Sequence, residues 1–473
     1  MLPVSKPAQR KPGLGGPKPQ GAPAPGARAA ALARLLRLAE SYPDLPLGEA
    51  RYPGLSPRDA ALAHAIVDAA VRRWITLEAI VQSRLDRPFI EVDAPVRAAL
   101  LGGAAQMLFL DKVPPHAAIF ETVEWVKSHQ ANAGGFVNGV LRAVSRLLYG
   151  VSTDAMPAKT RRDAWTDQRD EVPLASGGAL ALHAAILPSD LHQRWAIATS
   201  HPTALVKRWA GGLGETATRD LLQHNLIDDP PTTMNVAHAA ADLPAACKPH
   251  DVPGCRVWGG SREDLAAILA ARTDVWVQDA ASTLAVRDAA GLSPSLVIDL
   301  CAGRGTKTRQ LAATFPHAEI IASDPDSLRS TDLRGVAASC GRVRIVPPAA
   351  LREQFAGRAD LVLADVPCTN TGVLPRRCEA RYRWSRDQLD RLIALQRTII
   401  ADAAVLLAPG GTLVYATCSI EREENEDQVA WAAGLGFSAR TVRRTMPVGM
   451  PGGPEARYHD GAFSAVMDRG GGG

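Results

Sequence analysis

Two cysteines are candidate reactive residues, and each follows shortly after an apolar, strand-like segment. Residues 360–365 end in Asp365 and are followed closely by Cys368, and residues 412–416 are followed closely by Cys418. In a parallel α/β sheet the carboxyl ends of the strands open onto one crevice. Packing alone explains many single buried cysteines. Two thiols and a carboxylate in one crevice instead favour a catalytic site.

These groups suit methylation of a cytosine at carbon 5. That carbon is a poor nucleophile, and addition of a thiolate at carbon 6 makes it able to take a methyl group from a sulfonium donor. A free thiol has a pKa of about 8.5 and is intrinsically reactive, which suits this covalent step. A protonated carboxylic acid at the ring nitrogen, for which Asp365 is available, would stabilise the charge that builds up on addition. A second group must remove the carbon-5 proton, and the residues alone leave open which cysteine attacks.

Residues 296–308 form a strand-turn-helix pattern that offers a nucleoside site. Gly303 and Gly305 permit positive φ and close backbone approach, and the amides at the start of the helix can donate to a polar ligand. Asp324 ends the next strand-like segment, where a carboxylate can accept hydrogen bonds from ribose hydroxyls. A turn that binds nothing and an Asp324 that caps a helix are the alternatives. The predicted cofactor-binding residues are Cys301, Ala302, Gly303, Arg304, Gly305, Thr306, Lys307, Asp324 and Asp365.

The chain of 473 residues is long enough for several folded units. Residues 1–28 are rich in Pro, Gly and Ala and carry basic but no acidic residues, which predicts a disordered basic tail, either a non-specific nucleic-acid tether or a solubilising extension. Residues 29–150 have apolar residues at helical spacing and predict an all-α bundle. Residues 151–229 predict a polar linker followed by helical segments, and residues 230–275 a small α/β unit. Alternating strands and helices predict a Rossmann-like α/β domain over residues 276–473.

Composition sets broad limits on partners and compartment. The formal charge of +4 and the pI near 8.7 permit a nucleic-acid partner without requiring one. The seven cysteines include no close pair, which predicts individual thiols in a reducing compartment and no metal site. There is no apolar stretch of about 18 residues and no signal-peptide core near the N-terminus. We therefore expect a cytoplasmic monomer that binds no membrane and no metal.

Five motifs follow one another in the C-terminal half, at residues 299–308, 365–373, 413–419, 423–426 and 459–463. Together they resemble the motifs of the bacterial RNA cytosine-5 methyltransferases of the RsmB (Sun/Fmu) family. Upstream, Val113-Pro-Pro-His-Ala-Ala-Ile-Phe-Glu121 and Phe136-Val-Asn-Gly-Val-Leu-Arg142 resemble the NusB type of RNA-binding domain, which that family also carries. The resemblance implies a NusB-like N-terminal domain, S-adenosylmethionine as the cofactor and a cytosine of 16S ribosomal RNA as the substrate.

The resemblance also assigns roles to the two cysteines. By the pattern of the family, Cys418 is the nucleophile and Cys368 assists release of the product. In the related DNA methyltransferases the thiol that follows the proline attacks instead.

A basic segment with aromatic residues lies between the two cysteine motifs. Arginines can pair with phosphates while an aromatic ring stacks on a base, and the target base must leave its stack to reach the crevice. A solvated charged loop is the alternative interpretation. The predicted RNA-binding residues are Arg376, Arg377, Arg381, Arg383 and Trp384.

The chain departs from the family pattern in its cofactor region. The family turn usually reads Cys-Ala-Ala-Pro-Gly-Gly-Lys-Thr, whereas Gly303-Arg304-Gly305-Thr306 fills its middle here, and residues 346–350 offer no acid for the adenine. We expect an active cytosine-5 methyltransferase of 16S ribosomal RNA. The alternatives are a cytosine-5 methyltransferase of tRNA or another RNA, and a catalytically impaired RNA-binding factor for ribosome assembly. The presence of both cysteines and Asp365 weighs against the impaired factor.

Overall fold

The computed structural model describes residues 26–46, 50–150, 158–325 and 329–470. The predicted basic tail falls outside this part of the chain up to residue 25, and its last residues already belong to the first helix, which begins at Ala27. None of the helices in the described residues has the length and apolar character needed to span a membrane.

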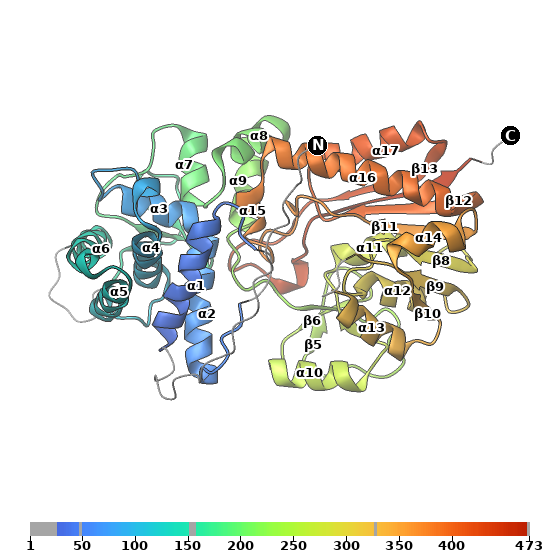
Figure 1. Ribbon diagram of the computed structural model, residues 1–473, viewed down its shortest axis with the longest axis horizontal. Helices are drawn as coiled ribbons and strands as arrows, with labels where there is room; N and C mark the ends of the chain where they lie inside the picture. The colour runs from blue at the N-terminus through green and yellow to red at the C-terminus, as the bar shows by residue number, and fades with distance from the viewer. Residues whose placement is uncertain (1–25, 47–49, 151–157, 326–328, 471–473) are drawn as a thin grey trace, which may run out of the picture.

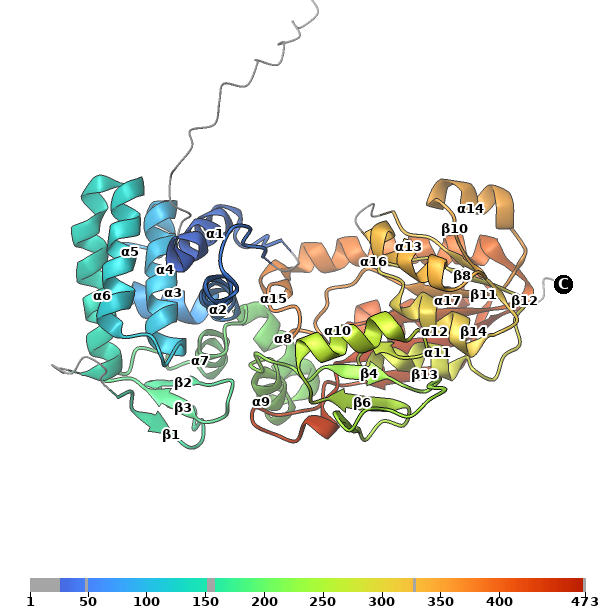
Figure 2. The ribbon, with the colours of Figure 1, turned by 90° about the horizontal axis from the view of Figure 1, so that it is seen from below.

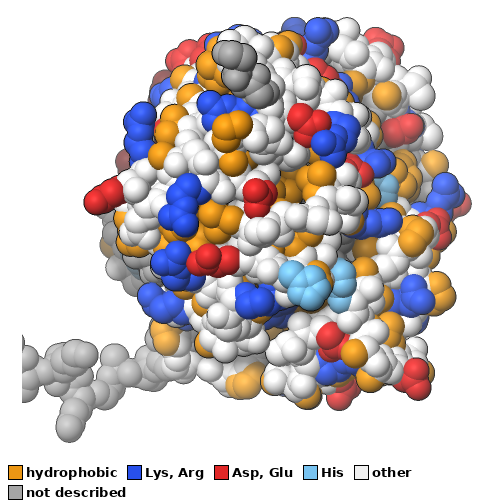
Figure 3. Space-filling view, turned by 90° about the vertical axis from the view of Figure 1, so that its right-hand side faces the viewer, with side chains coloured by type: hydrophobic (Ala, Val, Ile, Leu, Met, Phe, Trp, Pro, Cys, Tyr) orange, Lys and Arg blue, Asp and Glu red, His pale blue; other side chains and the backbone are white. Residues whose placement is uncertain are grey.

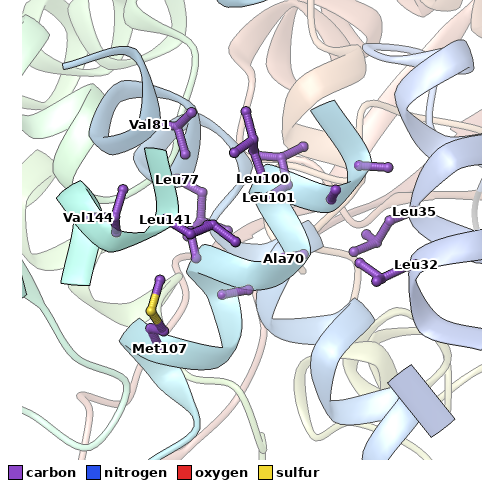
Figure 4. Close-up of a cluster of buried hydrophobic side chains, with 14 of the residues drawn as sticks. Leu32, Leu35, Ala70, Leu77, Val81, Leu100, Leu101, Met107, Leu141 and Val144 are labelled. Atoms are coloured by element: carbon purple, nitrogen blue, oxygen red, sulfur yellow. The ribbon is translucent and has the colours of Figure 1, made fainter. Parts of the chain in front are cut away.

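In the described residues, the N-terminal unit is a bundle of six α-helices, of which α4 is the central one (Figures 1 and 4). Apolar residues at helical spacing fill its core, with Leu32, Leu77 and Leu141 fully buried. Gly102 and Gly103 let neighbouring helices approach α4, because a Cβ at these positions would collide with the side chains of Leu32 and Leu141 respectively. The helices are α1 (Ala27–Ser41), α2 (Pro57–Arg72), α3 (Trp74–Gln82), α4 (Ala94–Phe109), α5 (Pro115–His129) and α6 (Gly134–Tyr149).

The segment that follows the bundle differs from its prediction. Instead of an irregular linker, residues 158–181 contain a three-stranded antiparallel sheet of β1 (Arg161–Arg162), β2 (Glu171–Pro173) and β3 (Ala179–Ala181). Val172 and Leu180 are buried in the same core as the helical bundle, which explains why so short a sheet is stable. Three helices then lie between the bundle and the C-terminal domain, namely α7 (Leu191–Ala198), α8 (Thr203–Leu213) and α9 (Glu215–His224) (Figure 1).

A small α/β unit precedes the large sheet. Its four antiparallel strands lie in the order β5-β6-β4-β7, with β4 at Thr233–Asn235, β5 at Cys247–Pro249, β6 at Cys255–Trp258 and β7 at Trp276–Val277. Helix α10 (Arg262–Ala271) packs on it (Figure 2). The last strand therefore lies just beyond the predicted end of this unit at residue 275.

The C-terminal domain is built on a seven-stranded sheet in the order β10-β9-β8-β11-β12-β14-β13. The first five strands are parallel, and β14 runs antiparallel to both of its neighbours. This is the predicted Rossmann-like arrangement. The strands are β8 (Leu296–Asp299), β9 (Glu319–Ala322), β10 (Val343–Ile345), β11 (Ala359–Asp365), β12 (Leu407–Thr417), β13 (Phe437–Thr445) and β14 (Ala462–Arg469).

Helices cover both faces of this sheet (Figures 1 and 2). Successive residues of a strand point to opposite faces, so Leu361 and Leu363 pack with α11, α12 and α13, while Val362 packs with α14, α16 and α17. Burial on both faces leaves only the carboxyl ends of the strands open for a site. The helices are α11 (Leu284–Asp288), α12 (Thr306–Thr314), α13 (Arg329–Ser339), α14 (Pro348–Phe355), α16 (Arg386–Leu406) and α17 (Glu426–Ala433).

The short helix α15 (Ala380–Arg383) joins the N-terminal bundle to the C-terminal domain. The Tyr382 hydroxyl donates a hydrogen bond to the Val71 carbonyl oxygen at 2.6 Å and lies 2.8 Å from the Ser200 hydroxyl. Arg72 donates to the carbonyl oxygen of Pro375 at 2.7 Å. The segment after Cys368 is thereby held against both N-terminal units.

Candidate active site

The carboxyl ends of four neighbouring parallel strands bring the predicted site residues together. Asp324 lies just beyond β9, the glycine turn follows β8, Asp365 ends β11 with Cys368 close behind, and Cys418 follows β12. Since the strands lie in the order β9-β8-β11-β12, these side chains form a row along one edge of the sheet.

The two cysteine side chains meet at the centre of this row. The Sγ atoms of Cys368 and Cys418 are 3.2 Å apart. Cys368 is buried, whereas Cys418 is half-buried. The hydrogen bond with Cys418 and, next, burial hold the pKa of the Cys368 thiol well above its usual value. The two thiols therefore differ in environment, with Cys418 the more accessible.

Asn370, which the sequence analysis did not single out, orients both cysteines. Its Nδ2 donates to the Cys368 carbonyl oxygen at 2.9 Å, and its Oδ1 accepts from Cys418 Sγ at 3.3 Å. The φ of Asn370 is +61°, a left-handed conformation that Asn adopts more readily than most residues. An Asn two positions after Cys368 was the available signal for a tight turn here.

Asp365 is paired with the lysine of the cofactor turn. The Lys307 ammonium lies 2.7 Å from Asp365 Oδ2. Burial acts to lower the pKa of Lys307, but the attraction of Asp365 and their hydrogen bond outweigh it, so that this pKa is raised. Lys307 therefore stays charged and fixes the position of the Asp365 carboxylate.

The glycine turn is shaped by the strand residues around it. Asp324 Oδ2 accepts a hydrogen bond from the Gly303 amide at 2.9 Å. Gly303 and Gly305 have φ values of +55° and +84°. A Cβ at Gly305 would meet Leu333 and Val336, whereas one at Gly303 would have no atom of the described residues within 4 Å. The open space at Gly303, beside a carboxylate at a strand end, fits a nucleoside ligand.

The side chain of Arg304 lies apart from this space. It is 79% exposed and pairs with Asp332 at 3.3 Å. Only the backbone of Arg304 belongs to the turn.

Below the turn, Asp299 is fully buried and accepts from the Thr308 hydroxyl at 2.6 Å. Burial raises its pKa to about 7. This contact joins the end of β8 to the first turn of α12.

The structure corrects part of the predicted RNA-binding set. Arg381 is 1% exposed and donates to the carbonyl oxygens of Thr199 and Asn225, and Trp384 is buried in a hydrophobic cluster, so neither side chain can reach RNA. Arg377 is exposed and Arg383 half-buried, and their predicted contact with RNA stays a prediction.

Arg376 is an exposed residue whose guanidinium pairs with two acids that the sequence analysis missed. Its guanidinium lies 2.7 Å from Asp460 and 3.3 Å from Asp279, and it donates to the Pro231 carbonyl oxygen at 2.9 Å. The side chain of Arg376 is 29% exposed. Arg376 thus connects Pro231 of the small α/β unit with Asp460 of the C-terminal motif.

A cavity of about 50 Å³ opens beside the cysteines. Cys418 and Lys307 line it, together with Asp279, Asp460 and Phe463, whereas Cys368 does not. Only Cys418 of the two thiols is thus presented to a space where a substrate group can enter. Among the described residues, no group of three or more His, Cys, Asp or Glu side chains is arranged to hold a metal ion.

Comparison with known proteins assigns the family. A model of the 16S rRNA methyltransferase RsmB/F family matches residues 290–445, and a model of the NusB family matches residues 27–146. A ribosomal RNA small subunit methyltransferase B of Xanthomonas campestris is 31% identical over 448 residues, which cover 88% of this chain and 91% of that protein. The chain belongs to this family. The corresponding protein of Vibrio cholerae is 28% identical, over 85% of this chain and 87% of its own length.

Membership of this methyltransferase family establishes S-adenosylmethionine as the cofactor. The glycine turn and Asp324 fit that group, since the turn leaves open space at Gly303. The solved structure of PH0851 has the same fold, with a TM-score of 0.68 and 20% identity over 96% of this chain and 100% of that one. The family match confirms the predicted NusB-like N-terminal domain.

Proposed function

We propose that this protein methylates carbon 5 of a cytosine in 16S ribosomal RNA through a covalent adduct with Cys418. The observation that carries the proposal is the meeting of two thiols beyond the carboxyl ends of β11 and β12, with only Cys418 of the two lining the cavity. A methyltransferase that acts on an amino group or a hydroxyl has no need of two adjacent thiols. The RNA named in the descriptions of the relatives supports the choice of substrate.

S-adenosylmethionine would lie at the glycine turn and supply an electrophilic methyl group. The Cys418 thiolate adds to carbon 6 of the cytosine, and the proton that the ring nitrogen takes up passes from the Lys307 ammonium through the Asp365 carboxyl group. Lys307 fixes the orientation of Asp365 from 2.7 Å away. After carbon 5 has been methylated, its proton passes to water, the bond between Cys418 and carbon 6 breaks with its electrons returning to sulfur, and Cys368 assists this release of the product.

The cavity wall supports an RNA substrate whose target base has left its stack. Beside the reactive thiol, the wall combines the charged groups of Lys307, Asp279 and Asp460 with the apolar ring of Phe463. Among the predicted RNA-binding arginines, Arg377 is exposed and Arg383 half-buried, so both are available for phosphates. Figure 3 shows that basic and acidic side chains are interspersed on the face at the C-terminal end of the molecule, so we assign RNA contact to the edge near the cysteines rather than to that face.

We further propose a division of labour along the chain. Residues 29–150 bind RNA, residues 151–275 connect this domain to the catalytic one, and residues 276–473 carry the cofactor and the cysteines. The contacts of Tyr382 and Arg72 support such an arrangement, because they tie the segment after Cys368 to the N-terminal units.

Methylation of 16S ribosomal RNA from cells lacking this gene tests the function. Purified protein and labelled S-adenosylmethionine should transfer label to that RNA, and bisulfite sequencing should reveal one new protected cytosine. Transfer to tRNA alone would redirect the substrate assignment. Donor binding by calorimetry without transfer to any RNA would contradict the enzymatic proposal.

A further inference from the structure

Glu424 is a fully buried carboxylate that contacts the loops of both cysteines. It ends the short helix η4 (Arg422–Glu424), six residues after Cys418, and is 0% exposed. Its Oε1 accepts hydrogen bonds from the Thr369 amide and from Gln396 Nε2, each at 2.9 Å. The Thr369 hydroxyl donates to its Oε2. A buried carboxylate is costly unless its oxygens are satisfied in this way.

The contacts of Glu424 extend to both sides of Cys368. Thr369 follows this cysteine directly, and Gln396 Nε2 also donates to the carbonyl oxygen of Pro367, which precedes it, at 3.0 Å. Glu424 and Gln396 together therefore fix the backbone on either side of Cys368.

The same cluster reaches the residue after Cys418. The Ser419 hydroxyl lies 3.1 Å from the hydroxyls of both Thr369 and Thr371, and Thr371 Oγ1 accepts from the Ile420 amide at 3.1 Å. Each of these hydroxyls is buried. The loop after β11 and the loop after β12 are thus joined through a group of hydroxyls, of which that of Thr369 contacts Glu424 directly.

We propose that Glu424 is a positioning residue for the catalytic pair: its carboxylate holds the Cys368 and Cys418 loops in one register, so that the two thiols meet. The separation of 3.2 Å between the sulfur atoms follows from this anchoring. Neither loop has a regular backbone ladder across Cys368 and Cys418, since β11 ends at Asp365 and β12 at Thr417. Beyond the strand ends, the Gly372 amide donates to the Cys418 carbonyl oxygen at 2.9 Å, and the Glu424 cluster adds the side-chain contacts between the two loops.

The charge of Glu424 acts in the same direction as its contacts. Glu424 faces Cys368 and, through its carbonyl oxygen, the Tyr415 hydroxyl at 2.7 Å. The hydrogen bond with Cys418 and burial raise the pKa of Cys368, and the negative charge of Glu424 adds to that effect. Cys368 is thereby kept as a thiol.

Thiol pairing in the full-length protein tests this role without RNA or cofactor. Diamide oxidises two adjacent thiols: a sulfur–sulfur bond forms, and the two hydrogens and two electrons reduce the nitrogen–nitrogen double bond of the reagent. Mass spectrometry of peptides follows the bond between Cys368 and Cys418. The proposal rests on the proposed function only in calling the two cysteines a catalytic pair. The rate of pairing depends on the geometry of the two thiols and requires no methyl transfer.

Glu424→Ala should slow pairing by about tenfold or more, and Glu424→Gln, which keeps an acceptor for the Thr369 amide, should restore most of the rate. Ser419→Ala removes only hydroxyl contacts and should slow pairing severalfold. This variant tests the proposal independently if Glu424→Ala fails to fold. The matched control is Glu421→Gln. Glu421 is a buried carboxylate of the same loop, but it accepts from Trp209 Nε1 at 2.9 Å instead of contacting the Cys368 loop.

The outcomes separate positioning from general loosening. In methyl transfer, Glu424→Ala should lower kcat while KM for RNA stays within about twofold, and Glu424→Gln should recover most of kcat. Pairing at the wild-type rate in both Glu424→Ala and Ser419→Ala would overturn the proposal. So would equal slowing in Glu421→Gln. An absence of methyl transfer in the wild-type protein, with these pairing rates as expected, would count against the proposed function and leave the positioning role intact.

Discussion

Lys307 Nζ lies 2.7 Å from Asp365 Oδ2, which joins the cofactor turn after β8 to the cysteine strand β11. The pair spans neighbouring strands, so the residue predicted to contact the cofactor also fixes the carboxylate predicted to act on the base. Lys307 lines the cavity together with Cys418. Its ammonium is therefore a shared element of the two halves of the proposed reaction.

Replacement of Lys307 by Met should remove this link while preserving most of the side-chain length. We expect kcat for methyl transfer to fall by about 10²-fold, the usual effect of losing one preorganised charged donor, because Asp365 loses its orientation. Steady-state kinetics with labelled donor measures it. Arg304→Met in the same turn should change kcat less than about twofold, because the Arg304 side chain forms only an exposed ion pair. Equal losses in both variants would contradict the assignment of Lys307.

Asp299 should make stability depend on pH. Its pKa is about 7 in the folded protein and about 3.9 in the unfolded chain. Between these values the folded state binds a proton that the unfolded state has lost, so stability falls as pH rises through this window and is level above it. The free energy of unfolding of the catalytic domain, measured with urea, should be lower at about pH 8 than at about pH 5. In Asp299→Asn this difference should be smaller than in the wild-type protein by roughly 2 kcal/mol. An unchanged loss would show that Asp299 is not the group responsible.

Replacement of each of the two turn glycines by Ala should affect a different property of the protein. A Cβ at Gly305 would lie 2.9 Å from Leu333 and Val336, so Gly305→Ala should chiefly lower thermal stability. A Cβ at Gly303 would point into open space. Gly303→Ala should therefore chiefly weaken donor binding, by about tenfold, with a stability cost of only about 1 kcal/mol for its positive φ. Calorimetry and thermal unfolding distinguish the two, and a reversed pattern would mean that the cofactor does not occupy this space.

Arg376 and Arg377 provide a test of the corrected RNA-binding set. Arg376 is bound to Asp460 and Asp279, so Arg376→Ala should destabilise the protein by roughly 1–3 kcal/mol through two uncompensated carboxylates and leave the salt dependence of RNA binding unchanged. Arg377→Ala should lower the salt slope by about 1 with little effect on stability. RNA binding at several salt concentrations decides this, and a lower slope in Arg376→Ala would restore its original assignment.

The sequence was most informative where a local pattern determines local structure. Apolar runs that end near Asp365 and Ala416 predicted strands, and the parallel order of those strands brought Cys368 and Cys418 together. The direction of the arginine side chains could not be read in the same way. Arg381 is satisfied by carbonyl oxygens of Thr199 and Asn225, more than 150 residues earlier in the chain, and the segment around Arg381 looks the same in sequence whether it is exposed or buried.

The small sheet at residues 158–181 was missed for a related reason. Its strands have two or three residues each, too short for an alternating pattern to be visible. Their stability comes from Val172 and Leu180, which are buried against a helical bundle formed by an earlier part of the chain. Glu424 likewise reads as one of several acids in its motif, and only the fold reveals that it is fully buried between two loops.

Detection of a covalent adduct between Cys418 and the target cytosine tests directly whether Cys418 is the nucleophile. Cys368→Ala should permit attack and methylation but slow release, so that incubation with S-adenosylmethionine and substrate RNA leaves an RNA–protein complex that survives denaturation, with the nucleotide attached to Cys418 by mass spectrometry. The double variant Cys368→Ala/Cys418→Ala should form no complex, and Cys418→Ala alone should transfer no methyl group. An adduct attached to Cys368 in Cys418→Ala, or undiminished methyl transfer by that variant, would contradict the account.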